Sequence, residues 1–127
     1  MILQVGKVIY SLLTGNAEIT KLVGKKIYPL IADFSTTFPF IVYKRDSIDE
    51  ATSKDRLINK QGATVTVVVA SDKYNNSIEV AQTVIDALRN KRGLIAGINV
   101  KDISLLGADE DYIDDTYIQR LSFKIEI

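Results

Sequence analysis

The segment from residue 109 to 115 holds the densest group of side chains that could do chemistry. It reads Asp109-Glu110-Asp111-Tyr112-Ile113-Asp114-Asp115, and clustered carboxylates from one loop are ligands that hard cations such as calcium prefer. The calcium-loop pattern is missing, because no glycine stands at the turn position and no glutamate closes a twelve-residue frame. Nothing apolar is arranged to raise a carboxyl pKa for acid–base catalysis. We therefore interpret the segment as a solvated acidic connector, and a small metal-dependent hydrolase is a hypothesis that depends wholly on it.

The composition excludes several other kinds of chemistry. The 127 residues include no histidine and no cysteine, which removes Ser-His-Asp triads, thiolate catalysis, disulfides and typical zinc sites. Gly24-Lys25-Lys26 and Gly6-Lys7 lack the upstream glycine and the following Ser or Thr that a phosphate loop requires. We therefore predict a protein that is not an enzyme, with no catalytic residue, no cofactor and no bound metal.

The charge pattern argues against nucleic acid and membrane as partners. Sixteen basic and sixteen acidic residues balance, so the whole molecule has no field to attract DNA, RNA or an anionic membrane. The stretch 44–60 carries five basic residues, but four interleaved acidic residues cancel most of their charge. No apolar run approaches the ~18 residues that a membrane span needs, and Gln4 and Lys7 interrupt the N-terminal apolar segment. We predict a soluble chain without specific nucleic-acid binding.

The stretch from residue 62 to 92 predicts a strand followed by a helix that covers it. Residues 63–71 are rich in β-branched side chains, and their alternation puts three valines on one face. After a turn-rich break, Ser77, or Asn76 one residue earlier, can cap a helix whose apolar positions fill one half of the cylinder. Gly93 is placed to end that helix in a left-handed conformation.

The remaining segments complete an α+β pattern. The predicted elements around the central strand and helix are a helix over 2–13, a short helix over 17–23 capped by Asn16 and ended by Gly24, an edge strand over 27–31, a strand over 40–45, a long mobile hairpin tip over 46–61, a strand over 99–106 and a last strand over 120–127. We predict one α+β domain over residues 1–127. Its antiparallel sheet of about four to five strands carries the N-terminal and central helices on one face, and a long charged hairpin loop projects from it.

Short motifs over nearly the whole chain indicate one protein family. They are Val8-Ile9-Tyr10-Ser11-Leu12-Leu13, Gly24-Lys25-Lys26-Ile27-Tyr28-Pro29, Phe38-Pro39-Phe40-Ile41-Val42-Tyr43, the helix Val80-Ala81-Gln82-Thr83-Val84-Ile85-Asp86-Ala87-Leu88 and Arg120-Leu121-Ser122-Phe123. In this order the chain resembles the tail-completion proteins of long-tailed bacteriophages and prophages, a family similar in fold to tail terminators. The charged segment from Ser47 to Gln61 departs from the family pattern.

The resemblance implies a structural protein that catalyses nothing. Such proteins assemble as a ring, commonly of six subunits, at the head-proximal end of the tail tube, where they end tube growth and join the tail to the head. The implied partners are further copies of the chain, the tail tube protein and the head–tail connector proteins. The implied location is the virion tail, after assembly in the host bacterial cytoplasm.

Two charged segments, the mixed stretch 46–61 and the acidic connector, could meet between neighbouring subunits. We predict that the side chains facing a neighbouring subunit or another partner are Arg45, Arg56, Lys60, Asp109, Asp111 and Asp115. An alternative hypothesis is a small cellular α+β binding or regulatory domain that acts as a dimer through the same sheet.

Overall fold

The structure, a computed structural model, describes residues 2–52 and 58–127, with side chains for residues 2–50 and 61–127. In chain order the described elements are the 3-10 helix η1 (Ile2–Gln4), α1 (Val5–Thr14), α2 (Ala17–Val23), β1 (Ile27–Pro29), β2 (Phe40–Thr52), β3 (Ile58–Ser71), α3 (Tyr74–Leu88), β4 (Gly93–Ile95), β5 (Ile98–Val100), β6 (Asp102–Ile113) and β7 (Thr116–Glu126). The predicted α+β class is confirmed.

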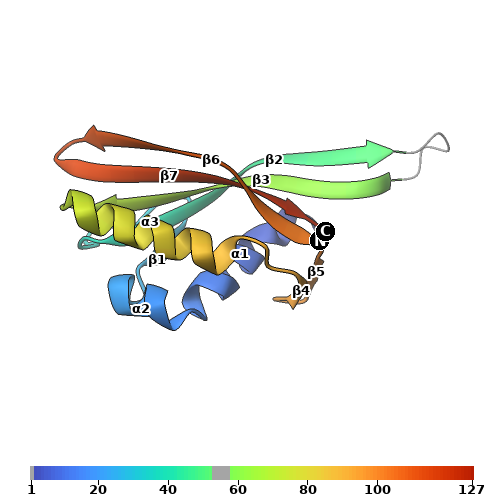
Figure 1. The fold of residues 1–127 in the computed structure, drawn as a ribbon, viewed down its shortest axis with the longest axis horizontal. Coiled ribbons are helices and arrows are strands. Elements are labelled where there is room, and N and C mark those ends of the chain that lie inside the picture. The colour runs from blue at the N-terminus through green and yellow to red at the C-terminus, as the bar shows by residue number, and fades with distance from the viewer. Residues whose placement is uncertain (1, 53–57) are drawn as a thin grey trace.

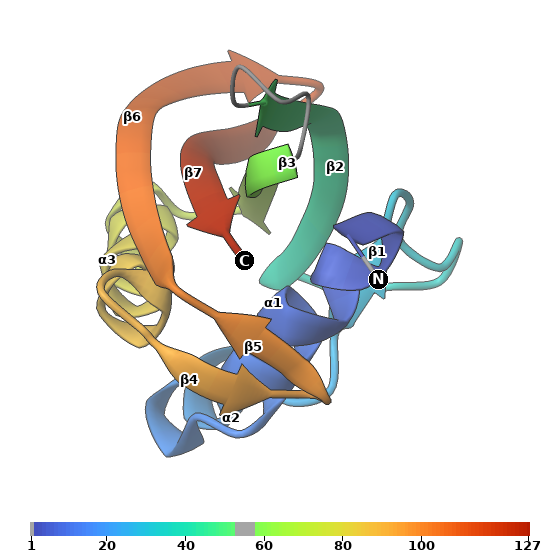
Figure 2. The ribbon, with the colours of Figure 1, turned by 90° about the vertical axis from the view of Figure 1, so that its right-hand side faces the viewer.

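A five-stranded sheet in the order β1-β2-β3-β7-β6 forms one layer, and the helices pack against one of its faces (Figure 1). The neighbours in the sheet are antiparallel except β1, which pairs with β2 in parallel so that Ile27 lies opposite Ile41. The sheet is therefore mixed, although the sequence predicted an antiparallel one. Pro29 lies at its edge, as predicted, where a missing ladder donor is tolerated. Figure 2 shows the strong twist of the sheet, with β4 and β5 pairing separately beside the helices.

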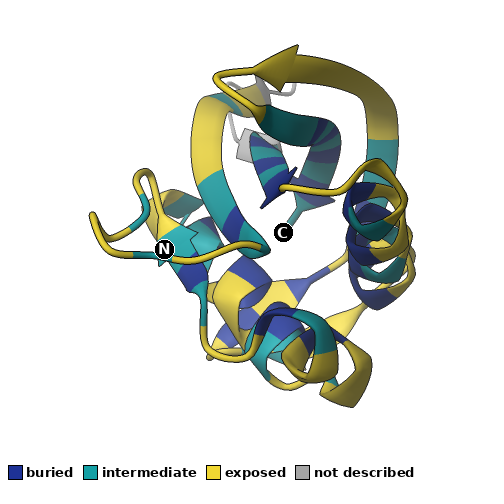
Figure 3. Ribbon diagram, turned by 90° about the vertical axis from the view of Figure 1, so that its left-hand side faces the viewer, coloured by how far each residue is buried: buried dark blue, intermediate teal, exposed yellow. Residues whose placement is uncertain are grey.

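The core lies between the helices and the central strand β3. Val65, Val67 and Val69 are fully buried, which confirms the predicted alternation. They face apolar side chains of α1 and α3, and β7 contributes Phe123, which lies opposite Val65. Figure 3 shows the buried positions on the strands and on the helices that cover them. The other buried members of this core include Val5, Val8, Ile9 and Leu13 of α1, Val80, Val84 and Leu88 of α3, and Leu121 and Ile125 of β7.

The helix boundaries follow local hydrogen bonding. The predicted cap of α2 is confirmed, because Asn16 Oδ1 accepts from the backbone N–H groups of Glu18 and Ile19 at 3.0 and 3.1 Å. The predicted cap of α3 is wrong. That helix begins at Tyr74, and Ser77 lies buried in its first turn, where its hydroxyl donates to the Tyr74 carbonyl at 2.6 Å.

The turn before α3 is organised by a residue at the end of β3 instead. Ser71 Oγ accepts from the Lys73 N–H at 3.1 Å and donates to Asn76 Oδ1 at 2.7 Å. The end of α3 also differs from the prediction, because Asn90 rather than Gly93 is the first residue after the helix with a left-handed backbone, at a φ of 65°. Asn tolerates this conformation better than other residues with a side chain.

Both predicted charged loops are largely strands. β2 and β3 pair from Phe40 opposite Ala70 to Thr52 opposite Ile58, and residues 53–57 lie outside the described part of the chain. The acidic connector is likewise the outer part of β6. Only Asp114 and Asp115 form its turn, with φ values of 52° and 60°, as a two-residue hairpin turn of the primed type requires. The predicted strand over 99–106 is divided between β5 and β6.

Candidate functional site

Two hairpins project from opposite ends of the molecule. Figure 1 shows the β2–β3 hairpin at the right-hand end and the β6–β7 hairpin at the left-hand end. Of the six predicted interface residues, Arg45 and the backbone of Lys60 lie on the first hairpin, and Asp109, Asp111 and Asp115 lie on the second. Within one copy Arg45 therefore does not meet the acidic groups. Their assignment to an interface stays a prediction.

Arg45 attaches strand β2 of the β2–β3 hairpin to η1. Arg45 Nη1 donates to the carbonyl of Leu3 in η1 at 2.6 Å, so this guanidinium has a partner inside its own copy. The backbone of Lys60 lies opposite Ala51 in the β2–β3 ladder, and its side chain lies outside the described residues. Arg56 lies wholly outside them.

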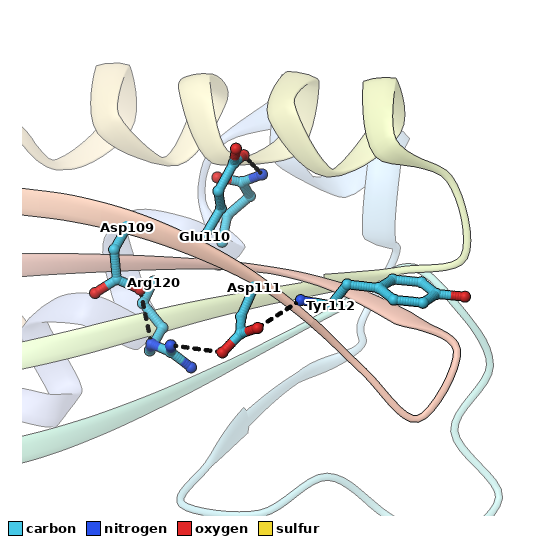
Figure 4. A network of polar contacts seen from close by, with 6 residues as sticks. Asp109, Glu110, Asp111, Tyr112 and Arg120 are labelled. Atoms are coloured by element: carbon cyan, nitrogen blue, oxygen red, sulfur yellow. Dashed lines mark hydrogen bonds and ion pairs between the residues drawn. The ribbon is translucent and has the colours of Figure 1, made fainter.

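The β6–β7 hairpin carries an ion-pair network on its outer face (Figure 4). Arg120 of β7 donates from Nε to Asp109 Oδ1 at 2.9 Å and from Nη2 to Asp111 Oδ2 at 3.4 Å. Because these side chains are substantially exposed, solvent screens the pairs and their contribution to stability is small. Their arrangement still fixes where two of the predicted carboxylates lie.

Three tyrosine rings surround a hollow on the other side of this hairpin. The ring of Tyr117 contacts those of Tyr74 and Tyr112, with centroid distances of 5.7 and 4.7 Å. The hollow has a volume of about 260 Å³, and Glu110 and Asp111 complete its lining. We call this feature the tyrosine hollow.

A partly buried chain of hydrogen bonds connects the tyrosine hollow to the first turn of α3. Glu110 accepts from the Tyr74 hydroxyl at 3.0 and 3.1 Å and from Gln119 Nε2 at 2.9 Å. Gln119 is buried, and the same amide nitrogen also donates to Ser77 Oγ at 3.2 Å. Figure 4 shows Glu110 turned towards α3, away from Asp109 and Arg120. The tip of the hairpin is therefore fixed to the helix.

The carboxylates also change the acidity of two ring hydroxyls. The hydrogen bond from Tyr74 to Glu110 raises the pKa of Tyr74, and the negative charge of Glu110 adds to the effect, since both favour the neutral phenol. The Tyr112 hydroxyl donates to Asp115 Oδ1 at 3.2 Å, and this hydrogen bond raises the pKa of Tyr112 in the same way. Both phenols therefore stay neutral donors at neutral pH.

Sequence reasoning missed most of the tyrosine hollow. The predicted interface residues include Asp111 and Asp115 but not Tyr74, Tyr112 or Tyr117. One signal could have found the ring pair: a two-residue turn at residues 114–115 places Tyr112 directly opposite Tyr117. The contribution of Tyr74 has no such local signal, because Tyr74 is the first residue of α3 and lies 36 residues before Glu110 in the sequence.

The arrangement offers recognition chemistry, namely aromatic faces beside negative charge. Among the residues that the structure describes, no group of three potential ligands is placed to hold a metal ion. Across the same residues, every helix is too short or too polar to cross a membrane.

A second exposed surface lies on the connection between β1 and β2. It displays four large apolar side chains, and exposed apolar groups gathered in this way mark interaction sites. They are Leu30, Ile31, Phe34 and Phe38, with exposed fractions of 71, 79, 108 and 40%. The connection is nevertheless held in place, since the Leu30 N–H donates to the Tyr43 carbonyl at 2.8 Å and Lys26 Nζ donates to the Thr37 carbonyl at 3.1 Å.

Comparison with known proteins places this fold in a family. The family described as tail completion protein gp17 matches residues 7–127. A chain of the solved structure titled "Virion of native gene transfer agent (GTA) particle" has the same fold, with a TM-score of 0.77 and 18% sequence identity over 93% of this chain and 90% of that chain. A search of curated proteins found no match. Because the family match spans nearly the whole sequence and confirms the resemblance in its motifs, this chain belongs to the tail completion protein gp17 family.

Proposed function

We propose that copies of this tail-completion protein assemble head to tail into a ring, with about six subunits, at the head-proximal end of a phage tail. There the ring terminates the tail tube and joins the tail to the head. Membership of the family gives the chain a structural role in the tail. The ring, its number of subunits and the junction with the head are the steps that we add.

The observation that carries the proposal is that the two ends of the molecule differ. The β2–β3 and β6–β7 hairpins project from opposite ends of the molecule (Figure 1). They differ in sequence and in charge, because the first carries basic and acidic residues together and the second is mainly acidic. A contact between two unlike surfaces at opposite ends is heterologous, and it repeats from copy to copy until the rotation closes a ring. A symmetric dimer would instead pair one surface with itself and leave the other unused.

The apolar connection between β1 and β2 supports contact with further tail proteins. Leu30, Ile31 and Phe34 are too exposed to serve the core of their own copy. We assign this connection to the tail tube protein or to a head–tail connector protein, both of which a ring at this position must contact. The completed assembly belongs to the virion tail and forms in the host bacterial cytoplasm.

Native mass measurement tests the proposal. We expect a multimer near six subunits, alone at high protein concentration or on addition of the tail tube protein. A Phe34→Ser variant should keep the ring and lose binding to the tube or connector. Leu106→Ser, at an exposed apolar residue of β6 outside this connection, is the control for general loss of apolar surface. A dimer under every condition would refute the ring and favour the alternative dimeric domain.

A further inference from the structure

Charge is separated along α3. At its first turn lies the tyrosine hollow, with Asp114 and Asp115 in the adjacent turn of the β6–β7 hairpin. Just beyond its last turn lie four basic residues, which we call the basic cluster: Arg89, Lys91, Arg92 and Lys101. α3 contains 15 residues and is therefore roughly 22 Å long. Figure 1 shows the β6–β7 turn near the start of α3, with β4 and β5 beyond its other end. The two groups are therefore separated by the length of the helix and cannot meet within one copy.

The negative charge around the tyrosine hollow is not neutralised within its copy. Arg120 pairs with Asp109 and Asp111, whereas within the described residues Glu110 and Asp115 accept from neutral amide or phenol donors and form no ion pair. These hydrogen bonds orient the two carboxylates without cancelling their charge. Asp72 and Lys73, which precede Tyr74 in the sequence, carry opposite charges and together add no net charge.

The shape and lining of the tyrosine hollow favour one cationic side chain. Its volume of about 260 Å³ lies just below the ~300–1,000 Å³ of pockets that hold small-molecule ligands. Tyr74 and Tyr112 are 43 and 54% exposed, so a side chain from another molecule can contact their rings. A lysine or arginine over a tyrosine face is attracted by the ring and would gain further from the nearby carboxylates.

The positive charge of the basic cluster is only partly neutralised within its own copy. Arg92 Nε lies 3.5 Å from Asp102 Oδ1, but Arg89, Lys91 and Lys101 are exposed and make no ion pair within the described part of the chain. Two further carboxylates are nearby: Asp86 precedes Arg89 by three residues on α3, and the backbone carbonyl of Glu126 accepts from the Lys101 N–H at 2.7 Å. Four basic residues thus stand against the carboxylates of Asp86, Asp102 and Glu126. The cluster therefore stays positive overall.

The dipole of α3 explains the sign of charge at each end but not the rings. A helix favours carboxylates at its N-terminus and basic groups at its C-terminus. Glu110 alone would satisfy the first preference. Three contacting tyrosines at the surface require another explanation, and tyrosine is enriched where proteins meet.

We propose that the tyrosine hollow of one copy receives an arginine or lysine side chain from the basic cluster of a second copy of the same chain. This inference rests on the proposed ring and names its contact. The expected pairing between copies also changes. The acidic β6–β7 hairpin meets the C-terminal end of α3 in the next copy, and its contacts are not limited to the basic residues of the β2–β3 hairpin.

Cysteine cross-linking tests the contact, because the natural chain has no cysteine. We would introduce Ile113→Cys beside the tyrosine hollow, Leu94→Cys beside the basic cluster and, as a control, Thr20→Cys on the exposed face of α2; all three sites are exposed. Mixing the first two variants under oxidation should give a mixed disulfide dimer in excess over dimers of either variant alone. Equal yields in the control mixture, or cross-linking of Ile113→Cys only with itself, would overturn the proposal.

A second variant tests the chemistry of the hollow. Tyr112→Leu, introduced into the Ile113→Cys chain, keeps apolar volume but removes the aromatic face, and should lower the mixed cross-link about tenfold. Tyr10→Leu on α1 is the matched control, since Tyr10 is 46% exposed and pairs with only one ring. A multimer in native mass without the mixed cross-link would refute this contact and leave the ring standing, whereas a chain that never multimerises and never cross-links would refute both.

Discussion

The buried amide of Gln119 should hold the tip of the β6–β7 hairpin against α3, and Gln119→Leu tests this. Leucine keeps an approximately similar volume but cannot donate the two hydrogen bonds to Glu110 and Ser77, which measure 2.9 and 3.2 Å. Neither acceptor is left without a partner. Glu110 still accepts from Tyr74, and the Ser77 hydroxyl still donates to the Tyr74 carbonyl.

The expected loss follows from these remaining partners. Each intramolecular hydrogen bond contributes about 1 kcal/mol net, and bonds to charged groups contribute more. Glu110 is exposed, so solvent screens most of that extra amount. Leucine regains part of the loss by burying apolar surface. We therefore expect Gln119→Leu to lower the free energy of unfolding by about 1–2 kcal/mol.

Urea denaturation with a matched control measures the effect. Gln82 donates from Nε2 to Asp86 Oδ1 at 3.0 Å on the exposed face of α3, so Gln82→Leu removes a similar bond at the surface and should change stability by about 0.5 kcal/mol or less. The urea dependence should keep its slope, because the surface exposed on unfolding hardly changes. If both variants lost the same amount, burial of Gln119 would not matter and the reasoning would be wrong.

Three further outcomes are expected. Asn16→Ala removes the cap of α2 and should cost about 1 kcal/mol in urea denaturation. Phe123→Ala leaves a cavity behind a fully buried ring and should cost about 3–5 kcal/mol, measured as the shift in the urea midpoint. Glu110→Gln should lower the pKa of Tyr74 towards its ordinary 10.0, which tyrosinate absorbance detects. The folded-state pKa is raised, so the stabilisation that Glu110 gives is present below the ordinary pKa of tyrosine. It is lost as pH rises through the folded-state pKa.

Elements with one buried face could be predicted from the sequence. The valines of β3, the alternation of β7 and the stripe of α1 each repeat at the period of their own element, because one side of each meets the same core. The cap at Asn16 was also predictable, since side-chain oxygen and helix N–H groups are neighbours in sequence.

Features that depend on distant partners could not be predicted in this way. Ser77 looks like a helix cap, but in the fold it accepts from Gln119, 42 residues away, and is buried in the first turn instead. Residues 44–50 of β2 are almost all exposed, and residues 106–113 of β6 are all exposed. They therefore show no apolar alternation, and the backbone ladder identifies them as strands. Charge runs without periodicity were therefore interpreted as loops.

The support behind each hairpin decides which one can hold a binding site. Beyond Gly62, which pairs with both Asp49 and Glu126, the β2–β3 hairpin continues as two strands only, and two strands alone are marginally stable in water. The β6–β7 tip is supported by a third strand and by a helix, because β3 pairs with β7 as far as Tyr117 and Gln119 joins the same segment to α3. Side chains must be held in fixed positions to recognise a specific group. The supported tip is therefore the better receiving surface, which favours a rigid tyrosine hollow that accepts long basic side chains from the neighbouring copy.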